Sequence, residues 1–242
     1  MLLLDIGNTT IKYRIYKEDK CVDSGLITKI ELAKRAEEEK EFKAVSTIFF
    51  ADVRGGFSSF LSQTFPKAKQ VSLQSDDLKY PFINAYQTPE TLGSDRKALV
   101  AAAYFVYPRT HCLVIDAGSC ITYDYIDDSG VYHGGAISPG IAMRYRALHQ
   151  QTGKLPDLTP SITNTFVGQS TDSAIHGGIF QGVLGEILHQ ISYYQQNYEN
   201  LHIVLTGGDW HWLFKNIKKP IFAEPNFLLD GMFALWQYNK NS

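Results

Sequence analysis

The chain contains the same pattern of predicted strands twice, and this repetition constrains its fold more than any other feature. Residues 2–27 give three short segments rich in apolar and β-branched residues, separated by the turns GNTT and KEDK. Residues 111–137 give three more such segments, the last two joined by DDSG. The sequences DIGNT (5–9) and DAGS (116–119) occupy the same place in each repeat. We infer an internal duplication.

Predicted helices and further strands complete each repeat. The first repeat continues with the strands 43–50 and 69–73 and with helices at 29–41, 53–64 and 96–106, and the last of these helices ends before a proline. The second repeat continues with the strand 201–205 and with helices at 141–151, 171–198, 209–217 and 227–239. This alternation predicts an α/β protein of two similar domains, residues 1–107 and 108–242.

Composition excludes several classes of protein. The 242 residues are 44% hydrophobic and 20% charged, which is typical of a folded globular protein. The 23 basic and 25 acidic residues are interspersed, so no cationic surface favours nucleic acid as a partner. No apolar stretch reaches the roughly 18 residues of a membrane span, so we expect a cytoplasmic protein with no membrane partner. The three cysteines show no CxxC spacing, which argues against a zinc site.

The two glycine-containing turns are suited to binding phosphate. A strand that ends in Asp-x-Gly exposes backbone N–H groups and nearby hydroxyls, and glycine lets the backbone approach a ligand closely. The aspartate could hold a cation between phosphates. Either turn alone is equally consistent with an ordinary β-hairpin, but two in equivalent places favour a polyphosphate site. LTGGD (205–209) adds two glycines against which a nucleoside could lie.

These residues resemble the acetate kinase, sugar kinase, Hsp70 and actin superfamily, whose two halves bind ATP. More narrowly, the chain resembles the type III pantothenate kinases in the order and spacing of its motifs. The motifs are DIGNT, TLGSDR (91–96), DAGSCIT (116–122), GGAISPGI (134–141), GQST (168–171) and LTGGD. Two positions depart from the family pattern: Ser119 replaces a threonine, and Cys120 stands where a small residue is common.

The resemblance implies both fold and function. It implies two ribonuclease H-like, or actin-like ATPase, domains, each with a mixed five-stranded sheet and flanking helices. It implies ATP-dependent phosphorylation of pantothenate to 4'-phosphopantothenate, the first step of coenzyme A biosynthesis. It also implies a homodimer, built through the second half, where residues 177–186 place four glycines in a helix. Two carboxylates near one triphosphate require magnesium to reduce their repulsion.

The resemblance also assigns roles to residues. Asp95 matches the catalytic base, although spacing alone favours a helix N-cap at this position. Asp116 matches a site for a monovalent cation, K⁺ or NH₄⁺, and Asp5 a magnesium site, directly or through water. The matching ATP-binding residues are Asp5, Gly7, Asn8, Thr9, Thr10, Lys12, Gly118, Ser119, Gly207 and Gly208. The matching pantothenate-binding residues are Tyr86, Gly93, Ser94, Asp95, Arg96 and Thr171.

Two alternatives of other classes stay open from the sequence. The phosphate turns alone also suit another small-molecule kinase or a polyphosphate phosphatase of the same fold. A non-catalytic regulatory accessory factor is the second alternative, although the sequence has no basic stripe or helix-turn-helix signature for direct DNA binding. The motifs GxxxxGK[ST], GxGxxG and GxSxG are absent, which argues against P-loop kinases, dinucleotide enzymes and serine hydrolases.

Overall fold

The computed structural model describes residues 1–7, 10–52 and 55–240. The chain divides into two compact units. Unit 1 contains Met1–Ile83, Gln87–Val106 and Phe227–Ser242, and unit 2 contains Asn84–Tyr86 and Tyr107–Asn226. The expected second domain, 108–242, included the C-terminal segment Phe227–Ser242, which here groups with unit 1. The reason is a close helix contact, described below.

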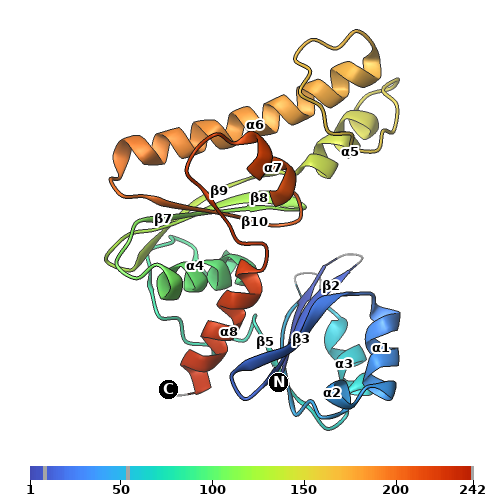
Figure 1. Cartoon of the computed structure of the whole chain (residues 1–242), viewed down its shortest axis with the longest axis vertical. Coiled ribbons are helices and arrows are strands. Elements are labelled where there is room, and N and C mark those ends of the chain that lie inside the picture. Colours follow the sequence, from blue (N-terminus) through green and yellow to red (C-terminus); the bar gives the residue numbers. More distant parts are fainter. Residues whose placement is uncertain (8–9, 53–54, 241–242) are drawn as a thin grey trace. The chain divides into compact units, whose positions relative to one another are not determined.

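Unit 1 contains a mixed five-stranded sheet, as predicted (Figure 1). Its order is β3-β2-β1-β4-β5, with β1 antiparallel to β2 and parallel to β4. The strands are β1 (Leu2–Ile6), β2 (Ile11–Lys17), β3 (Lys20–Ile27), β4 (Thr47–Asp52) and β5 (Lys69–Ser72). The helices are α1 (Lys29–Glu38), α2 (Lys40–Lys43), α3 (Phe57–Thr64), α4 (Ser94–Val106) and α8 (Phe227–Lys240), with a 3-10 turn at Pro89–Thr91.

Apolar side chains cover both faces of β1. Leu2 and Leu4 pack in a core cluster with residues of α1, α2 and α3. Leu3 is also fully buried, and alternation along a strand turns it to the opposite face. On that face Phe49, paired with Leu3, contacts Trp236 of α8 at 6.0 Å between ring centroids. Because both faces of β1 are covered, its first three residues, Leu2 to Leu4, are all apolar.

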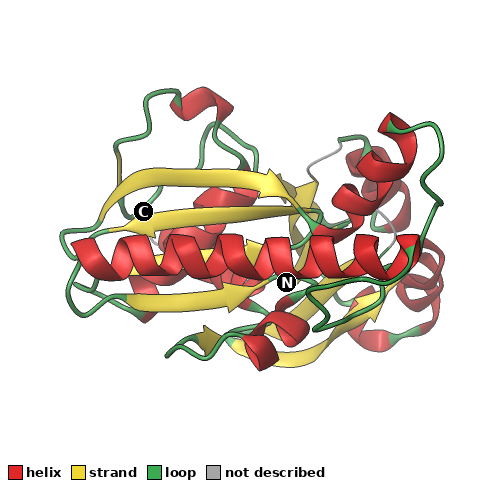
Figure 2. Ribbon diagram, turned by 90° about the horizontal axis from the view of Figure 1, so that it is seen from above, coloured by secondary structure: helices red, strands yellow, loops and turns green. Residues whose placement is uncertain are grey.

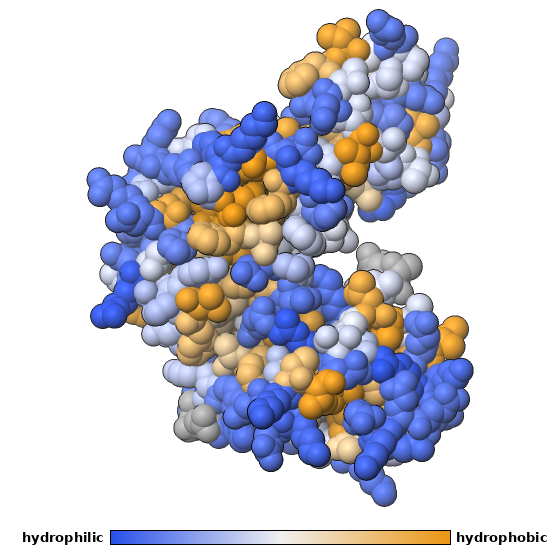
Figure 3. Space-filling model, in the orientation of Figure 1, coloured by the Kyte–Doolittle hydropathy of each residue, from blue (hydrophilic) through white to orange (hydrophobic). Residues whose placement is uncertain are grey.

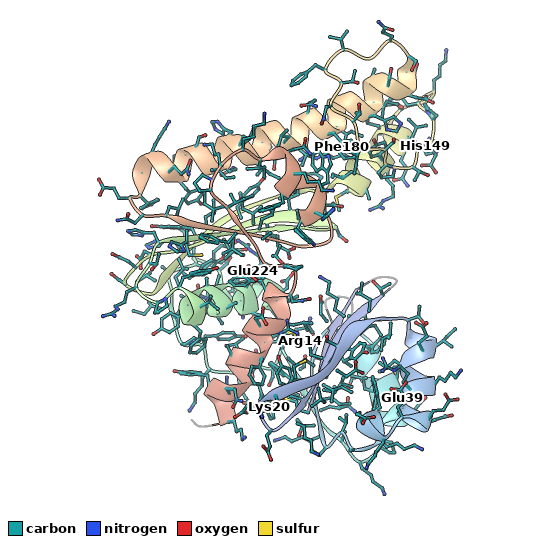
Figure 4. The ribbon with its side chains drawn as sticks, in the orientation of Figure 1. Arg14, Lys20, Glu39, His149, Phe180 and Glu224 are labelled. Carbon is teal, nitrogen blue, oxygen red and sulfur yellow. The ribbon has the colours of Figure 1, made fainter. Side chains whose placement is uncertain are left out.

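The C-terminal helix α8 is fixed to unit 1 by close packing and by polar contacts. A side chain at Gly231 would overlap the carbonyl oxygen of Ala98, so glycine lets α8 approach the backbone of α4. Arg14 of β2 lies beside α8 (Figure 4) and forms an ion pair with Asp230. These contacts join residues far apart in the sequence, which is why a division by chain order misplaces α8.

Unit 2 repeats the strand pattern of unit 1 and adds a strand. Its order is β11-β10-β7-β8-β9-β6, with β7 antiparallel to β8 and parallel to β10, as β1 is to β2 and β4. The strands are β6 (Ile83–Asn84), β7 (Cys112–Ala117), β8 (Cys120–Ile126), β9 (Val131–Pro139), β10 (His202–Thr206) and β11 (Phe222–Ala223). The sheet has six strands instead of five because β6 pairs with the edge strand β9.

Three helices cover one face of this second sheet: α5 (Ile141–Gln151), α6 (Thr171–Asn197) and α7 (Trp210–Asn216). Figure 2 shows α6 lying along the strands. A buried stripe with a spacing of four residues faces the sheet, namely Ile175, Ile179, Val183, Ile187 and Ile191. Phe180 of α6 (Figure 4) packs edge-on against Trp212 of α7, with ring centroids 4.7 Å apart. In the described part of the chain, no helix has the length and apolarity to cross a membrane.

Candidate active site

The turn after β1 is built around Gly7. Its N–H donates to the carbonyl oxygen of Thr10 at 3.0 Å, and a side chain at this position would place its Cβ 2.9 Å from that same oxygen. Glycine therefore allows the tight turn. Thr10 itself is exposed. Asn8 and Thr9, two predicted ATP-binding residues, lie outside the described residues.

Asp5 lies within the electrostatic field of two other predicted site residues. Lys12 is its direct partner in the antiparallel β1–β2 ladder. Asp5 alternates with Leu3, so its side chain projects from the sheet face that α8 covers. Burial raises the pKa of Asp5 above its usual value, the Lys12 ammonium lowers this pKa, and the Asp95 carboxylate raises it. The first turn and Asp95 are therefore close enough for two carboxylates to repel each other.

Asp95 belongs to the first turn of α4. The N–H of Lys97 donates to the carbonyl oxygen of Gly93 at 3.1 Å, which makes Gly93 the N-cap. Asp95 is two residues into the helix, so it is not the N-cap that spacing alone allowed. Its Oδ1 accepts a hydrogen bond from the N–H of Arg96 at 2.9 Å. Ser94 and Arg96 are buried, whereas Asp95 is half-buried and accessible to a ligand.

The turn after β7 is supported by the start of α5. The N–H of Gly118 donates to the carbonyl oxygen of Cys120 at 2.9 Å, and the N–H of Gly140 donates to that of Ser119 at 3.1 Å. Gly140 is the N-cap of α5, and a side chain there would overlap the carbonyl oxygen of Gly118. The positive end of the α5 dipole therefore adjoins this turn, which favours an anion. Gly140 lies in the quoted motif GGAISPGI, but no site role was predicted for it.

Asp116 has threonine neighbours on both adjacent strands. Thr122 of β8 and Thr206 of β10 are its direct partners in the sheet, so the three side chains share one face. This is the face opposite to α6, because Ile115 and Ala117 alternate with Asp116 and pack in the α6 cluster. The hydroxyl oxygen of Thr122 is buried and has no hydrogen-bond partner among the described residues. Hydroxyl and carboxylate oxygens therefore gather at the end of β7.

The segment LTGGD folds back over the end of β7. Gly207 has a φ of +95°, and a side chain there would overlap the carbonyl oxygen of Ala117 and the carboxylate of Asp116. The N–H of Asp209 donates to the same Ala117 oxygen at 2.9 Å, and burial raises the pKa of Asp209. Gly208 has open space where a side chain would stand, so its bare backbone is accessible to a ligand. Asp209 and Thr206 were not predicted, although both flank the predicted glycines.

Tyr86 and Thr171 both belong to unit 2, in different surroundings. Tyr86 follows β6 and packs against Gly134 of β9. Thr171 is the exposed first residue of α6 and lines a cavity of about 890 Å³ together with Arg144 of α5. The predicted residues therefore lie in four places: Asp5, Lys12 and Asp95 in unit 1, Asp116 with the turns at Gly118 and Gly207 in unit 2, Tyr86 against β9, and Thr171 at the α5–α6 cavity.

Comparison with known proteins identifies the family. The family model of type III pantothenate kinase matches residues 1–193. The type III pantothenate kinase of Flavobacterium johnsoniae is 42% identical over 98% of each chain. That of Christiangramia forsetii is 41% identical over 99% of this chain and 98% of the relative.

Solved structures show the same fold at low sequence identity. A conserved Campylobacter jejuni protein, assigned to the Baf family of transcriptional activators, is 24% identical with a TM-score of 0.64, and the match covers all of both chains. The ethanolamine utilization protein EutJ of Carboxydothermus hydrogenoformans is 13% identical with a TM-score of 0.51, over 97% and 88% of the two chains. Since the family model matches most of the chain and curated relatives match nearly all of it, the chain belongs to the type III pantothenate kinase family.

Proposed function

We propose that this protein transfers the γ-phosphoryl group of ATP to the hydroxyl of pantothenate, giving 4'-phosphopantothenate for coenzyme A biosynthesis. Family membership sets the reaction, and the grouping of Asp5, Lys12 and Asp95 in unit 1 is the observation that supports it. A carboxylate acceptor for a proton stands beside a glycine turn suited to phosphate. No comparable observation favours the phosphatase or regulator alternatives.

In this mechanism, Asp95 orients the attacking hydroxyl and accepts its proton late, because phosphoryl transfer passes through a loose transition state. The exposed hydroxyls of Thr10 and Ser119 beside the two glycine turns would donate to phosphate oxygens, because the N–H groups of Gly7 and Gly118 already donate within the turns. Arg96, buried at the start of α4, would bind the carboxylate of pantothenate. The bound substrates are thereby aligned, which supplies much of the rate enhancement.

A divalent cation suits the carboxylates of unit 1. Asp5 provides a hard oxygen ligand, and the repulsion from the Asp95 carboxylate, which adds to burial in raising the pKa of Asp5, would fall when a cation lies near Asp5. Asp5 would hold Mg²⁺ directly or through water. When bound, the ion neutralises charge on the phosphate oxygens.

A monovalent cation, K⁺ or NH₄⁺, suits Asp116. The orphaned hydroxyl of Thr122 supplies a second oxygen beside this carboxylate. Within the described ranges no three His, Cys, Asp or Glu side chains form a metal-binding group, which fits a weakly held ion better than a structural metal. We expect Asp116→Asn to reduce the response of turnover to added K⁺, because an amide cannot offset cation charge. An unchanged potassium response would contradict this role.

We also propose a homodimer built through α6 and the segment before it. Ile162, Phe166 and Val167 are 65–81% exposed, and Figure 3 shows hydrophobic side chains on the surface of this region. Gly178 and Gly185 of α6 have open space where side chains would stand, so contacts within the chain do not explain them. A second copy would cover this apolar surface. Thr171, the first residue of α6, would then lie beside this interface.

The decisive experiment measures ADP release with and without pantothenate, in potassium and in sodium buffers. We expect release that requires pantothenate and rises in potassium. Release without pantothenate would indicate a phosphatase, and no release under any condition would indicate a regulator.

A further inference from the structure

Tyr86 is held in a defined position by strand β9. The N–H of Ala85 donates to the carbonyl oxygen of Tyr132 at 3.0 Å, which fixes the backbone of the segment to the strand. The N–H of Tyr86 donates to Oδ1 of Asn84, also at 3.0 Å. The Tyr86 ring then lies along β9 and stacks on Tyr132, with centroids 6.2 Å apart and planes inclined by 19°. Both backbone and ring are thus located by the same strand.

Gly134 provides the space that the Tyr86 ring occupies. A Cβ at position 134 would lie 2.9 Å from Cδ2 and 3.1 Å from Cε2 of Tyr86, closer than such contacts normally come. The next glycine serves a different purpose, since a side chain at Gly135 would overlap the backbone of Tyr123 on the paired strand. Glycine at position 135 is therefore required by the close approach of the paired strand, whereas glycine at position 134 leaves room for the Tyr86 ring.

A buried polar pair supports the ring from beneath. Tyr132 is fully buried, and its hydroxyl donates to Oδ1 of Asp124 at 2.7 Å. Asp124 is also fully buried. Burying a carboxylate is unfavourable. Well-packed apolar side chains in place of a buried polar pair usually stabilise a core at least as much as the pair does. What the hydrogen bond adds is a fixed orientation of the Tyr132 ring, on which Tyr86 stacks.

We propose that Gly134, Tyr132 and Asp124 form a positioning platform for Tyr86 that sets affinity for the acceptor substrate and leaves ATP binding unaffected. The proposal rests on the proposed function, in which Tyr86 contacts pantothenate. None of the three platform residues has to touch the substrate, because each acts through the position of the Tyr86 ring.

A double-mutant cycle between Gly134→Ala and Tyr86→Ala tests the platform. Gly134→Ala should raise KM for pantothenate by at least about fivefold, as expected for residues in contact, with KM for ATP within about twofold of the parent. In the Tyr86→Ala background the same substitution should change KM for pantothenate by less than about twofold. An effect of equal size in both backgrounds would overturn the proposal.

A control separates crowding from backbone strain. Gly134 has a φ of +93°, so alanine is strained there whatever the space. Gly56 has a similar φ of +91° with no atom within 4 Å of an added Cβ. Gly56→Ala should therefore lower the melting temperature as Gly134→Ala does, but leave KM for pantothenate unchanged. A similar rise in KM for both variants would attribute the effect to strain and contradict the platform.

A spectroscopic measurement tests the platform without turnover. With 3-fluorotyrosine at position 86, the ¹⁹F resonance reports the ring environment in the substrate-free protein. Gly134→Ala and Tyr132→Phe should each shift this resonance, and unshifted resonances in both folded variants would overturn the proposal. If the parent fails to phosphorylate pantothenate, the proposed function fails, while the ¹⁹F shifts still decide whether the platform positions Tyr86. If Tyr132→Phe does not fold, Gly134→Ala alone decides.

Discussion

At the scale of single residues, Asp95 carries the sharpest test of the proposed chemistry. It lies in the first turn of α4 beyond the N-cap Gly93, where its Oδ1 accepts from the N–H of Arg96, a bond that the amide oxygen of asparagine can also accept. Asp95→Asn keeps the size of the side chain but removes the proton acceptor, and general-base catalysis typically contributes about 10² to 10⁴ in rate. We expect turnover to fall at least about a hundredfold, with ATP binding by calorimetry nearly normal. Turnover within a few-fold of the parent would place the base elsewhere.

Asp5 gives a second prediction, on stability as a function of pH. Its pKa in the folded protein is raised, mainly by burial, so its ionised form destabilises the fold as pH rises above the usual range of an aspartate. Asp5→Asn removes this cost and should increase the free energy of unfolding at pH 7. The gain should shrink as pH falls through the raised pKa of Asp5, because Asp5 itself is then protonated in the folded protein. Urea unfolding of the parent and of Asp5→Asn, from pH 7 down to pH 4, measures this difference in the free energy of unfolding.

The matched control for Asp5 is Asp157→Asn, which makes the same change of charge at an exposed position. It should leave stability nearly unchanged at both pH values. A gain at pH 7 as large as that of Asp5→Asn would attribute the effect to net charge instead of burial.

At the scale of elements, the glycines of α6 divide into two kinds. A Cβ at Gly177 would lie 2.6 Å from the carbonyl oxygen of Thr165, whereas Gly185 is exposed and has no atom within 4 Å of an added Cβ. Gly177→Ala should therefore destabilise by about 1–3 kcal/mol through overpacking. Gly185→Ala should stabilise by up to about 1 kcal/mol, because alanine is the better helix former. Denaturant unfolding compares the pair, and a shift in the same direction for both would contradict this assignment.

Local patterns predicted the elements well, and long-range contacts explain the exceptions. Short apolar runs that end in Asp-x-Gly located β1 and β7 with their aspartates, because these signals lie within a few residues. The expected helix 29–41 is instead broken at Glu39, which is extended and accepts from Arg35 through both carboxylate oxygens at 2.7 Å. No glycine or proline marks that break. The extra strand β6 and the contact of Gly231 with α4 likewise depend on residues distant in the sequence.

At the scale of the whole molecule, the proposed dimer should depend on the exposed apolar side chains before α6. The exposed Phe166 lies in the segment that leads into α6, so Phe166→Glu should dissociate the dimer in light scattering by placing a charge on the apolar surface. A parent that is monomeric at micromolar concentration would refute the dimer itself.

Subunit complementation tests whether Thr171 acts across that interface. Asp95→Asn and Thr171→Val should each be nearly inactive alone, the first without its base and the second without a substrate contact. If each site combines Asp95 of one subunit with Thr171 of the other, a mixed dimer contains one site with both native residues. Random exchange makes about half of the dimers mixed, so the mixture should regain about a quarter of the parent activity. If both residues of a site come from one subunit, the mixed dimer has no native site. The mixture would then stay as inactive as its components.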